Sequence, residues 1–256
     1  MLIPKNLPKY SPETAVDYHH KIFSHISHVL DPNQEFKWKL FKEGSNVGIN
    51  RDGEIQMSVG WMERMAHHKS VTDCRAGHDF SDVDAELPAF CENVAATCAH
   101  EMAHGRLKHI KSDWNSSLST GFIVGGSMGL ATISFIALDG LRNQPLFKIT
   151  RAKRVKTTWI LFVAMATLVL IGLHFRSKHM KRLRDDEHEA DVAGMKILKD
   201  IGIKPEAMTN MLRTVYLTDK MHSDSIDPSS WGYKLNRTHP TPKQRYDYCM
   251  KMFSSV

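Results

Sequence analysis

Apolar residues recur at helical spacing near the start of the chain. Ser11-Pro12 has the form of a helix N-cap followed by proline at the first helical position. Apolar residues then return on one helical face, at Val16, Phe23, Ile26 and Leu30. The pattern predicts an amphipathic helix over residues 12–30, and we expect its histidines to be solvated or partly packed.

After this helix the pattern changes to short alternating runs. Residues 36–40 and 54–59 have the period of strands, and Asp52-Gly53 between them is a hairpin turn signal. The two runs predict a small antiparallel sheet. Residues 60–66 are expected to be helical, and residues 67–88 to form a polar loop.

Two long apolar runs lie in the middle of the chain. Residues 114–138 and 157–173 contain no charged residue, which suits bilayer spans. Lys and Arg clusters flank both runs, as headgroup anchors would, and disfavour the alternative of a buried hairpin in a soluble core. We predict a two-helix transmembrane hairpin over residues 114–175, with spans at about 118–138 and 157–175. A close-packing face in the first span is a candidate for oligomerisation: Gly121, Gly125 and Gly129.

The other helices lie on either side of these runs. Pro88 is expected to open a helix that runs to about Lys111. Beyond the second run, the pattern predicts helices over 176–200 and 204–222, a loop over 223–238, and a short last helix after the turn at 238–242. The expected fold class is α+β, mainly helical with a small sheet.

The distribution of charge and the cysteines indicate which classes of binding partner and which compartment to expect. The formal net charge is +6, and the basic excess lies beside the apolar runs, where it suits phospholipid headgroups. The sequence contains no recognisable nucleic-acid-binding module and no basic stretch interleaved with aromatics, so we expect no nucleic-acid partner. The cysteines form no CxxC pair and are interpreted as free thiols in a reducing compartment: Cys74, Cys91, Cys98 and Cys249.

The segment His100-Glu101-Met102-Ala103-His104 carries candidate metal chemistry. Positions i and i+4 lie on one helical face, so His100 and His104 can present imidazole nitrogens to a single ion. Glu101 would then lie beside the metal, where it can take a proton from water. A catalytic zinc site has three protein ligands and an open position, so the hypothesis requires one more ligand.

The helix predicted over 176–200 offers that ligand. Glu187 and Asp191 share a stripe with apolar residues and should face the core, whereas Glu189 lies on a solvent face. Glu187 is therefore the better ligand, and Asp191 can accept a hydrogen bond from a metal-bound imidazole. Gly194 would let the two helices pack closely. A charged surface helix is the alternative interpretation of this segment.

Three motifs together resemble those of the integral-membrane zinc metallopeptidases of the HtpX and CAAX prenyl protease type: His100-Glu101-x-x-His104, Glu187-x-x-x-Asp191 and Thr238-His239-Pro240. In HtpX-like members two membrane spans separate the HExxH helix from the Glu helix, as two apolar runs do here. The resemblance also includes Asn46-Val47-Gly48, and it covers roughly residues 45–250. The chain departs from that pattern in its start, which has no membrane hairpin, and in a polar insertion at about 66–89.

The resemblance implies a discontinuous zincin-like domain of residues 1–112 and 176–256. It implies one Zn²⁺ held by His100, His104 and Glu187, with Glu101 as the general base. It further implies that His239 and Arg245 bind the substrate or the oxyanion. A substrate is expected to add as an extended strand at a sheet edge near residues 46–59, with Asn46, Val47 and Gly48 as the substrate-binding residues.

The expected function is that of a membrane-anchored zinc metalloendopeptidase acting on membrane or misfolded proteins. Its catalytic domain is expected to face the cytosol from an inner or cytoplasmic membrane. One alternative is a non-catalytic membrane adaptor with a structural or vestigial zinc, for which His109 or His188 would supply a fourth ligand. A second is a prenyl-protein protease, although two spans are too few for the enclosed chamber of that type.

Overall fold

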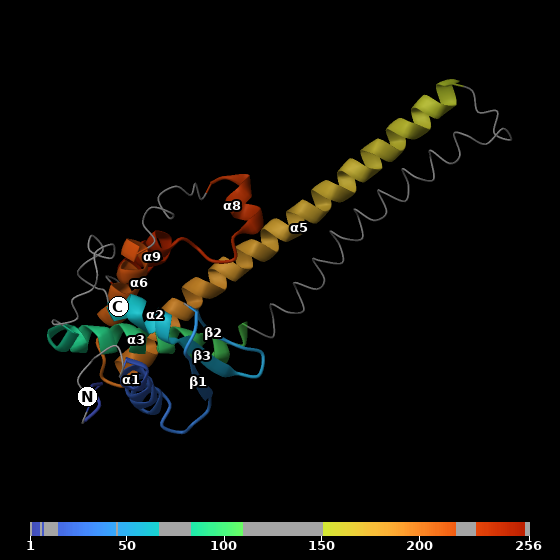
Figure 1. Cartoon of the computed structure of the whole chain (residues 1–256). Helices are drawn as coiled ribbons and strands as arrows, with labels where there is room; N and C mark the ends of the chain where they lie inside the picture. The colour runs from blue at the N-terminus through green and yellow to red at the C-terminus, as the bar shows by residue number, and fades with distance from the viewer. Residues whose placement is uncertain are drawn as a thin grey trace, which may run out of the picture. The chain divides into compact units, whose positions relative to one another are not determined.

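The computed structural model describes residues 2–5, 7, 15–44, 46–66, 83–109, 151–218 and 229–253 (Figure 1). The chain divides into two compact units. One comprises residues 1–111, 184–228 and 239–256, and the other comprises residues 112–183 and 229–238. All site residues that the sequence predicts belong to the first unit.

The first unit contains a three-stranded sheet in the order β1-β3-β2, where β1 is Lys37–Phe41, β2 is Val47–Ile49 and β3 is Glu54–Ser58 (Figure 1). β2 and β3 are antiparallel, whereas β1 and β3 are parallel. The prediction of a purely antiparallel sheet is therefore wrong, and the sheet is mixed. The hairpin turn commits one edge of β3 to β2, so β1 joins the opposite edge, where its direction makes it parallel to β3.

Asn50 holds the hairpin turn in place. Its side-chain oxygen accepts hydrogen bonds from the backbone N–H groups of Asp52 (3.0 Å) and Glu54 (2.9 Å). Gly53 has a φ of 75°, which glycine adopts without steric cost. The predicted turn is present, but it joins β3 to the short β2 rather than to the run at 36–40.

Helix α1 (Ala15–Leu30) buries one face against α3. Val16 is 37% exposed, so its predicted place on the buried face is wrong. The buried stripe begins two residues later and consists of Tyr18, Ile22, Phe23, Ile26 and Leu30. His19 is only 2% exposed and meets the Phe90 ring edge to face. Burial of this stripe removes apolar area from water and holds α1 on the core.

Helix α2 (Val59–Ala66) follows β3 directly, as expected for residues 60–66. Helix α3 runs from Val83 to Arg106, so the predicted start at Pro88 and end near Lys111 are both wrong. Pro88 stands at the sixth helical position, where its missing N–H removes one hydrogen bond, and the buried face that follows it offsets this cost. The helix ends because Lys108 adopts a left-handed φ of 58°.

Helix α5 runs without a break from Arg151 to Asp200, and thus joins the predicted second span to the helix predicted over 176–200 (Figure 1). Among the residues that the structure describes, no helix is long and apolar enough to cross a membrane. The side chains of residues 151–158, 160–162 and 165 are not among those described. The predicted first span, with Gly121, Gly125 and Gly129, lies outside the described residues.

Three further helices follow: α6 (Glu206–Thr218), α8 (Trp231–Asn236) and α9 (Pro242–Phe253). α6 matches the helix predicted over 204–222 as far as the structure describes it, and α9 is the expected last helix. α8 lies in a segment predicted to be a loop. It begins where the Ser230 hydroxyl caps the helix by accepting a hydrogen bond from the Tyr233 N–H at 3.1 Å.

Gly194 allows α5 to lie directly against α3. A Cβ atom at this position would lie 2.6 Å from the Met208 side chain, 3.2 Å from the backbone nitrogen of His100 and 3.4 Å from the carbonyl carbon of Ala99. The close approach predicted from the sequence is therefore present. The His100 nitrogen is a backbone atom at less than ordinary contact distance, so a larger side chain would push the helices apart.

We predict that Gly194→Val destabilises the protein by forcing α5 away from the metal-site backbone of α3. The free energy of unfolding should fall by about 1–3 kcal/mol. Gly232→Val is the matched control, because a Cβ at Gly232 in α8 meets no atom within 4 Å. Urea unfolding of both variants beside the wild type makes the comparison, and equal losses in the two variants would contradict the packing argument.

Candidate metal centre

Helix α3 presents His100 and His104 one turn apart on one face. Small side chains allow this part of α3 to lie inside the core, since Ala95, Ala96, Ala99 and Ala103 are fully buried. The His100 side chain is 6% exposed and that of His104 is 13% exposed. Their Nε2 atoms lie 3.1 Å apart, so both rings turn the same nitrogen to a common point.

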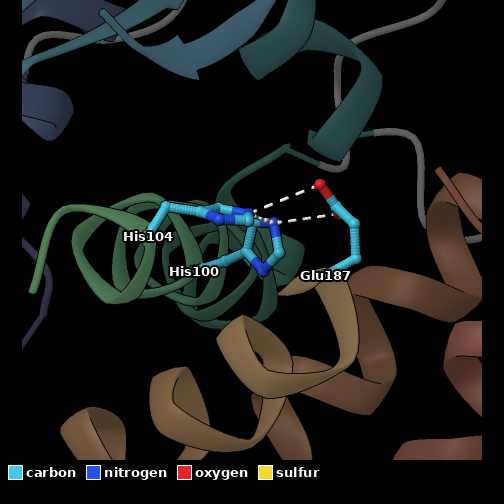
Figure 2. A group of neighbouring side chains, drawn as sticks. All are labelled: His100, His104 and Glu187. Atoms are coloured by element: carbon cyan, nitrogen blue, oxygen red, sulfur yellow. Dashed lines mark hydrogen bonds and ion pairs between the residues drawn. The ribbon is translucent and has the colours of Figure 1, made fainter. Parts of the chain in front are cut away.

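Glu187 reaches the same point from α5 (Figure 2). Its Oε2 atom lies 3.5 Å from His100 Nε2, and its Oε1 atom lies 3.4 Å from His104 Nε2. A tetrahedral zinc ion with ligand bonds of about 2.0–2.1 Å keeps its ligand atoms about 3.4 Å apart. The three separations fit an ion of that size, and two imidazoles with one carboxylate are a donor set that zinc accepts.

Asp191 orients His100 from one turn further along α5. Its Oδ1 atom lies 3.0 Å from His100 Nδ1, so the ring can donate to this carboxylate while Nε2 faces the metal position. The Asp191 side chain is completely buried. Arg245 holds it with a two-pronged interaction, from Nη2 to Oδ1 at 2.6 Å and from Nε to Oδ2 at 2.9 Å.

The start of α9 positions Arg245. Thr241 and Gln244 form a capping box, in which the Gln244 N–H donates to the Thr241 hydroxyl (3.2 Å) and the Thr241 N–H donates to the Gln244 side chain (3.0 Å). Pro242 occupies the first helical position, where its missing N–H costs nothing. Arg245 therefore lies in the first turn of α9, and its Nη1 atom is 3.1 Å from Glu187 Oε2.

The charges of this cluster stabilise one another. Burial raises the pKa of Glu187, but Arg245 and the hydrogen bonds from the histidines outweigh it and lower the pKa well below its usual value. Burial also raises the pKa of Asp191, but the charge of Arg245 and the hydrogen bond from His100 outweigh it and lower the pKa to about 2. Burial and Arg245 lower the pKa of His100, but hydrogen bonds with Asp191 and Glu187 prevail and raise it to about 9. These carboxylates therefore favour the protonated form of His100.

Glu101 and His239 differ in exposure. Glu101 follows His100 in the same helical turn and is 7% exposed. The His239 side chain is 67% exposed, yet its Nδ1 atom lies 2.8 Å from Glu187 Oε1. The structure thus brings the predicted residues His239 and Arg245 to the same carboxylate, although they are more than fifty residues away from it in the sequence.

The predicted substrate segment, Asn46-Val47-Gly48, lies on the edge strand β2. Residues of 41–50, with Gln56 and Ser58, line a pocket of about 540 Å³ here. The N–H of Ser58 donates to Asn46, and the N–H of Asn50 donates to Glu54. Because antiparallel pairs alternate, the backbone groups of Val47 and Ile49 point away from β3, towards the open edge of the sheet.

Neither His109 nor His188 joins His100, His104 and Glu187 as a fourth ligand among the described residues. His188 instead packs against Tyr248, with ring centroids 4.3 Å apart and the rings tilted by 36°. His109 contacts His104, with Nδ1 atoms 3.0 Å apart. From the sequence, His109 is a candidate only for a fourth metal ligand. Side chains on a helix contact each other at spacings of three or four residues. His104 and His109 are five residues apart across the end of a helix, so their spacing does not predict the contact.

We predict that zinc binding displaces a proton from His100. The pKa of His100 in the metal-free protein is about 9, so it is protonated at lower pH, whereas a metal ligand must be a neutral imidazole. Apparent zinc affinity should therefore rise about tenfold per pH unit from pH 7 and level off near pH 9. Calorimetry in two buffers of different ionisation enthalpy counts the proton. His28→Ala, on the exposed side of α1, should release as many protons as the wild type; a binding enthalpy that does not depend on the buffer would contradict the assignment.

Comparison with known proteins identifies the family. The family model for peptidase family M48 matches residues 47–250, which is well over half of the chain. No curated protein and no solved structure matches the chain. The matched range contains the HExxH segment, Glu187, Asp191, His239 and Arg245. The M48 family consists of zinc-dependent metallopeptidases, and the geometry of the cluster agrees with that chemistry. The chain belongs to peptidase family M48.

Proposed function

We propose that the protein is a membrane-anchored zinc metalloendopeptidase that hydrolyses peptide bonds in membrane or misfolded proteins. The observation that carries this proposal is the buried cluster of His100, His104 and Glu187 in a chain of the M48 family. Retention of Glu101 beside the first ligand supports catalysis, because a purely structural metal site has no need of a carboxylate there.

His100, His104 and Glu187 would hold the zinc. When bound, the zinc supplies Lewis acidity towards a carbonyl oxygen and lowers the pKa of water. The role proposed for Glu101 is to take the proton from the attacking water and to return it to the leaving amine. Because Arg245 is engaged by Asp191 and Glu187, its proposed role is to hold these carboxylates, and the exposed His239 is the better candidate to bind the oxyanion.

The substrate is proposed to bind as an extended strand along β2. The outward backbone groups of Val47 and Ile49 offer a hydrogen-bonding edge for an added strand. β2 also lies beside the metal-bearing end of α3, since a Cβ at Gly105 would come within 2.9 Å of the Ile49 side chain. Main-chain pairing of this kind binds many sequences, which suits an enzyme that acts on misfolded chains.

The apolar part of α5 supports anchoring in a membrane. Large apolar side chains are exposed along it: Trp159, Val163, Leu168, Val169, Leu170, Ile171 and Phe175. Four of them are consecutive, so they face all sides of the helix rather than one stripe. Basic residues flank this stretch at 151–156 and 176–184. Such a surface is costly in water and favourable in a bilayer.

The catalytic unit is proposed to face the cytosol from an inner or cytoplasmic membrane. Cys91, Cys98 and Cys249 are free and buried, and unpaired thiols of this kind persist in a reducing compartment. The basic residues beside the apolar stretch do not discriminate between the two sides, because both ends of the stretch carry them. Unfolded or membrane-bound chains on the cytosolic side would then be the substrates.

We predict that Glu101→Gln strongly slows cleavage without loss of zinc. The isosteric amide cannot take a proton from water, so the rate of casein cleavage by the purified protein should fall by about 10²–10⁴-fold. Glu92→Gln, on the same helix, is the matched control and should cleave at the wild-type rate. Zinc content is measured in parallel by elemental analysis.

Two outcomes would count against this proposal. Cleavage that survives in the Glu101→Gln variant would remove Glu101 from the chemistry. If the wild type holds its zinc but does not cleave casein, the result would favour the alternative function, that of a non-catalytic membrane adaptor.

We further predict that charges in the apolar part of α5 release the protein from membranes. A lysine near the centre of a span costs about 2.5–3.5 kcal/mol, so Val163→Lys with Leu170→Lys should move the protein from the carbonate-resistant membrane fraction into the soluble fraction. Val16→Lys is the control, because Val16 is an exposed apolar residue of α1. Equal fractionation of the two variants, or a soluble wild type, would refute the anchor.

A further inference from the structure

His109 lies behind the metal ligand His104. The two Nδ1 atoms are 3.0 Å apart, and the rings meet nearly edge to face with centroids 5.2 Å apart. The His109 side chain is only 9% exposed. It reaches this position because the chain turns at the end of α3, where Lys108 has a left-handed φ of 58° and donates its N–H to the Gly105 carbonyl at 3.2 Å.

Two carboxylates of α5 face the other side of the His109 ring. Its Nε2 atom lies 3.5 Å from Glu189 Oε2 and 3.9 Å from Asp186 Oδ1. Asp186 and Glu189 are three positions apart, so they lie on neighbouring turns of one face and flank the metal ligand Glu187. The Oδ2 atom of Asp186 is buried and has no hydrogen-bond partner among the described residues.

These three residues have the form of a second metal site, since one ligand atom from each lies within 4.8 Å of the others. Proton counting argues against that assignment. A neutral imidazole carries one proton, on one of its two nitrogens. If Nε2 of His104 binds a metal, the proton of His104 is on Nδ1 and is donated to Nδ1 of His109. The proton of His109 is then on Nε2, which has no lone pair left for a second ion.

We propose that His109 is a positioning residue, which holds the metal ligand His104 in one tautomer and one ring orientation through a His104–His109–carboxylate chain. This inference rests on the proposed zinc site. The Nε2 atom of His109 lies within ion-pair distance of Glu189 and Asp186, whose negative charge stabilises that tautomer. Asp191 orients the ligand His100 directly. For the ligand His104, the imidazole of His109 lies between the ring and the carboxylates of α5.

The test compares His109→Ala and His109→Gln with the wild type, using the full-length protein and zinc alone as the probe. Competition with a chromogenic chelator gives the dissociation constant, and elemental analysis gives the stoichiometry. The wild type should bind one zinc. His109→Ala should bind one zinc about 10–100-fold more weakly. His109→Gln, whose side-chain oxygen can accept from His104, should recover part of that loss.

A spectroscopic readout separates positioning from general destabilisation. The visible absorption bands of the Co²⁺-substituted protein report ligand geometry. We expect them to change in His109→Ala and to return towards the wild-type pattern in His109→Gln. His28→Ala, which removes an exposed histidine of α1, controls for unspecific binding and should change neither affinity nor spectrum. If His109→Ala fails to fold, the double variant Asp186→Asn with Glu189→Gln tests the same chain from its other end, and it should also weaken zinc binding.

Each remaining outcome overturns a distinct statement. If the wild type bound two zinc ions and His109→Ala bound one, His109 would be a ligand of a second metal site and not a positioning residue. Wild-type affinity and spectrum in His109→Ala would remove His109 from the metal centre altogether. Failure of the wild type itself to bind zinc would instead refute the proposed function, and a zinc-loaded wild type without peptidase activity would refute only its catalytic part.

Discussion

The ion pair between Arg245 and Asp191 is the interaction on which the metal centre depends. Asp191 is completely buried, and an isolated charge in such a place would cost several kcal/mol. The guanidinium satisfies both oxygens of Asp191 and reaches Glu187 as well. With it in place, one carboxylate can orient His100 and another can turn to the metal, although both lie in the core. Three elements distant in sequence, α3, α5 and α9, are thereby joined around a few charged groups.

Arg245 also changes how the family motifs are understood. The sequence resemblance suggested an arginine that meets the substrate, whereas its donors are already directed to carboxylates of the protein. The exposed group at this end of the cluster is His239, whose side chain is in contact with Glu187 and with solvent. A histidine in this position can respond to an arriving peptide, while an arginine locked by a bidentate pair retains its geometry.

Sequence reasoning identified the parts of the site that follow from helical periodicity. The spacing of His100 and His104, and the preference for Glu187 over Glu189, both follow from the 3.6-residue repeat, and the structure brings these three predicted residues together. It failed where tertiary contacts decide. The parallel pairing of β1 with β3, the start of α3 ahead of Pro88 and the short helix α8 depend on neighbours that no local pattern reveals. The pairing of His104 with His109 was missed for the same reason, because it depends on a left-handed turn at Lys108, a non-glycine residue.

The close approach of α5 to α3 at Gly194 has a mechanical meaning. The carboxylate that orients His100 and the third ligand both belong to one stretch of α5, and the histidines that bind the ion belong to one stretch of α3. Each stretch is a stiff rod on the scale of a side chain. The ligands therefore lie on two rigid helices, α3 and α5. The absence of a side chain at Gly194 allows the short distance between these helices. Gly194, which lies outside the ligand cluster, thus contributes to the spacing of the two helices that carry the ligands.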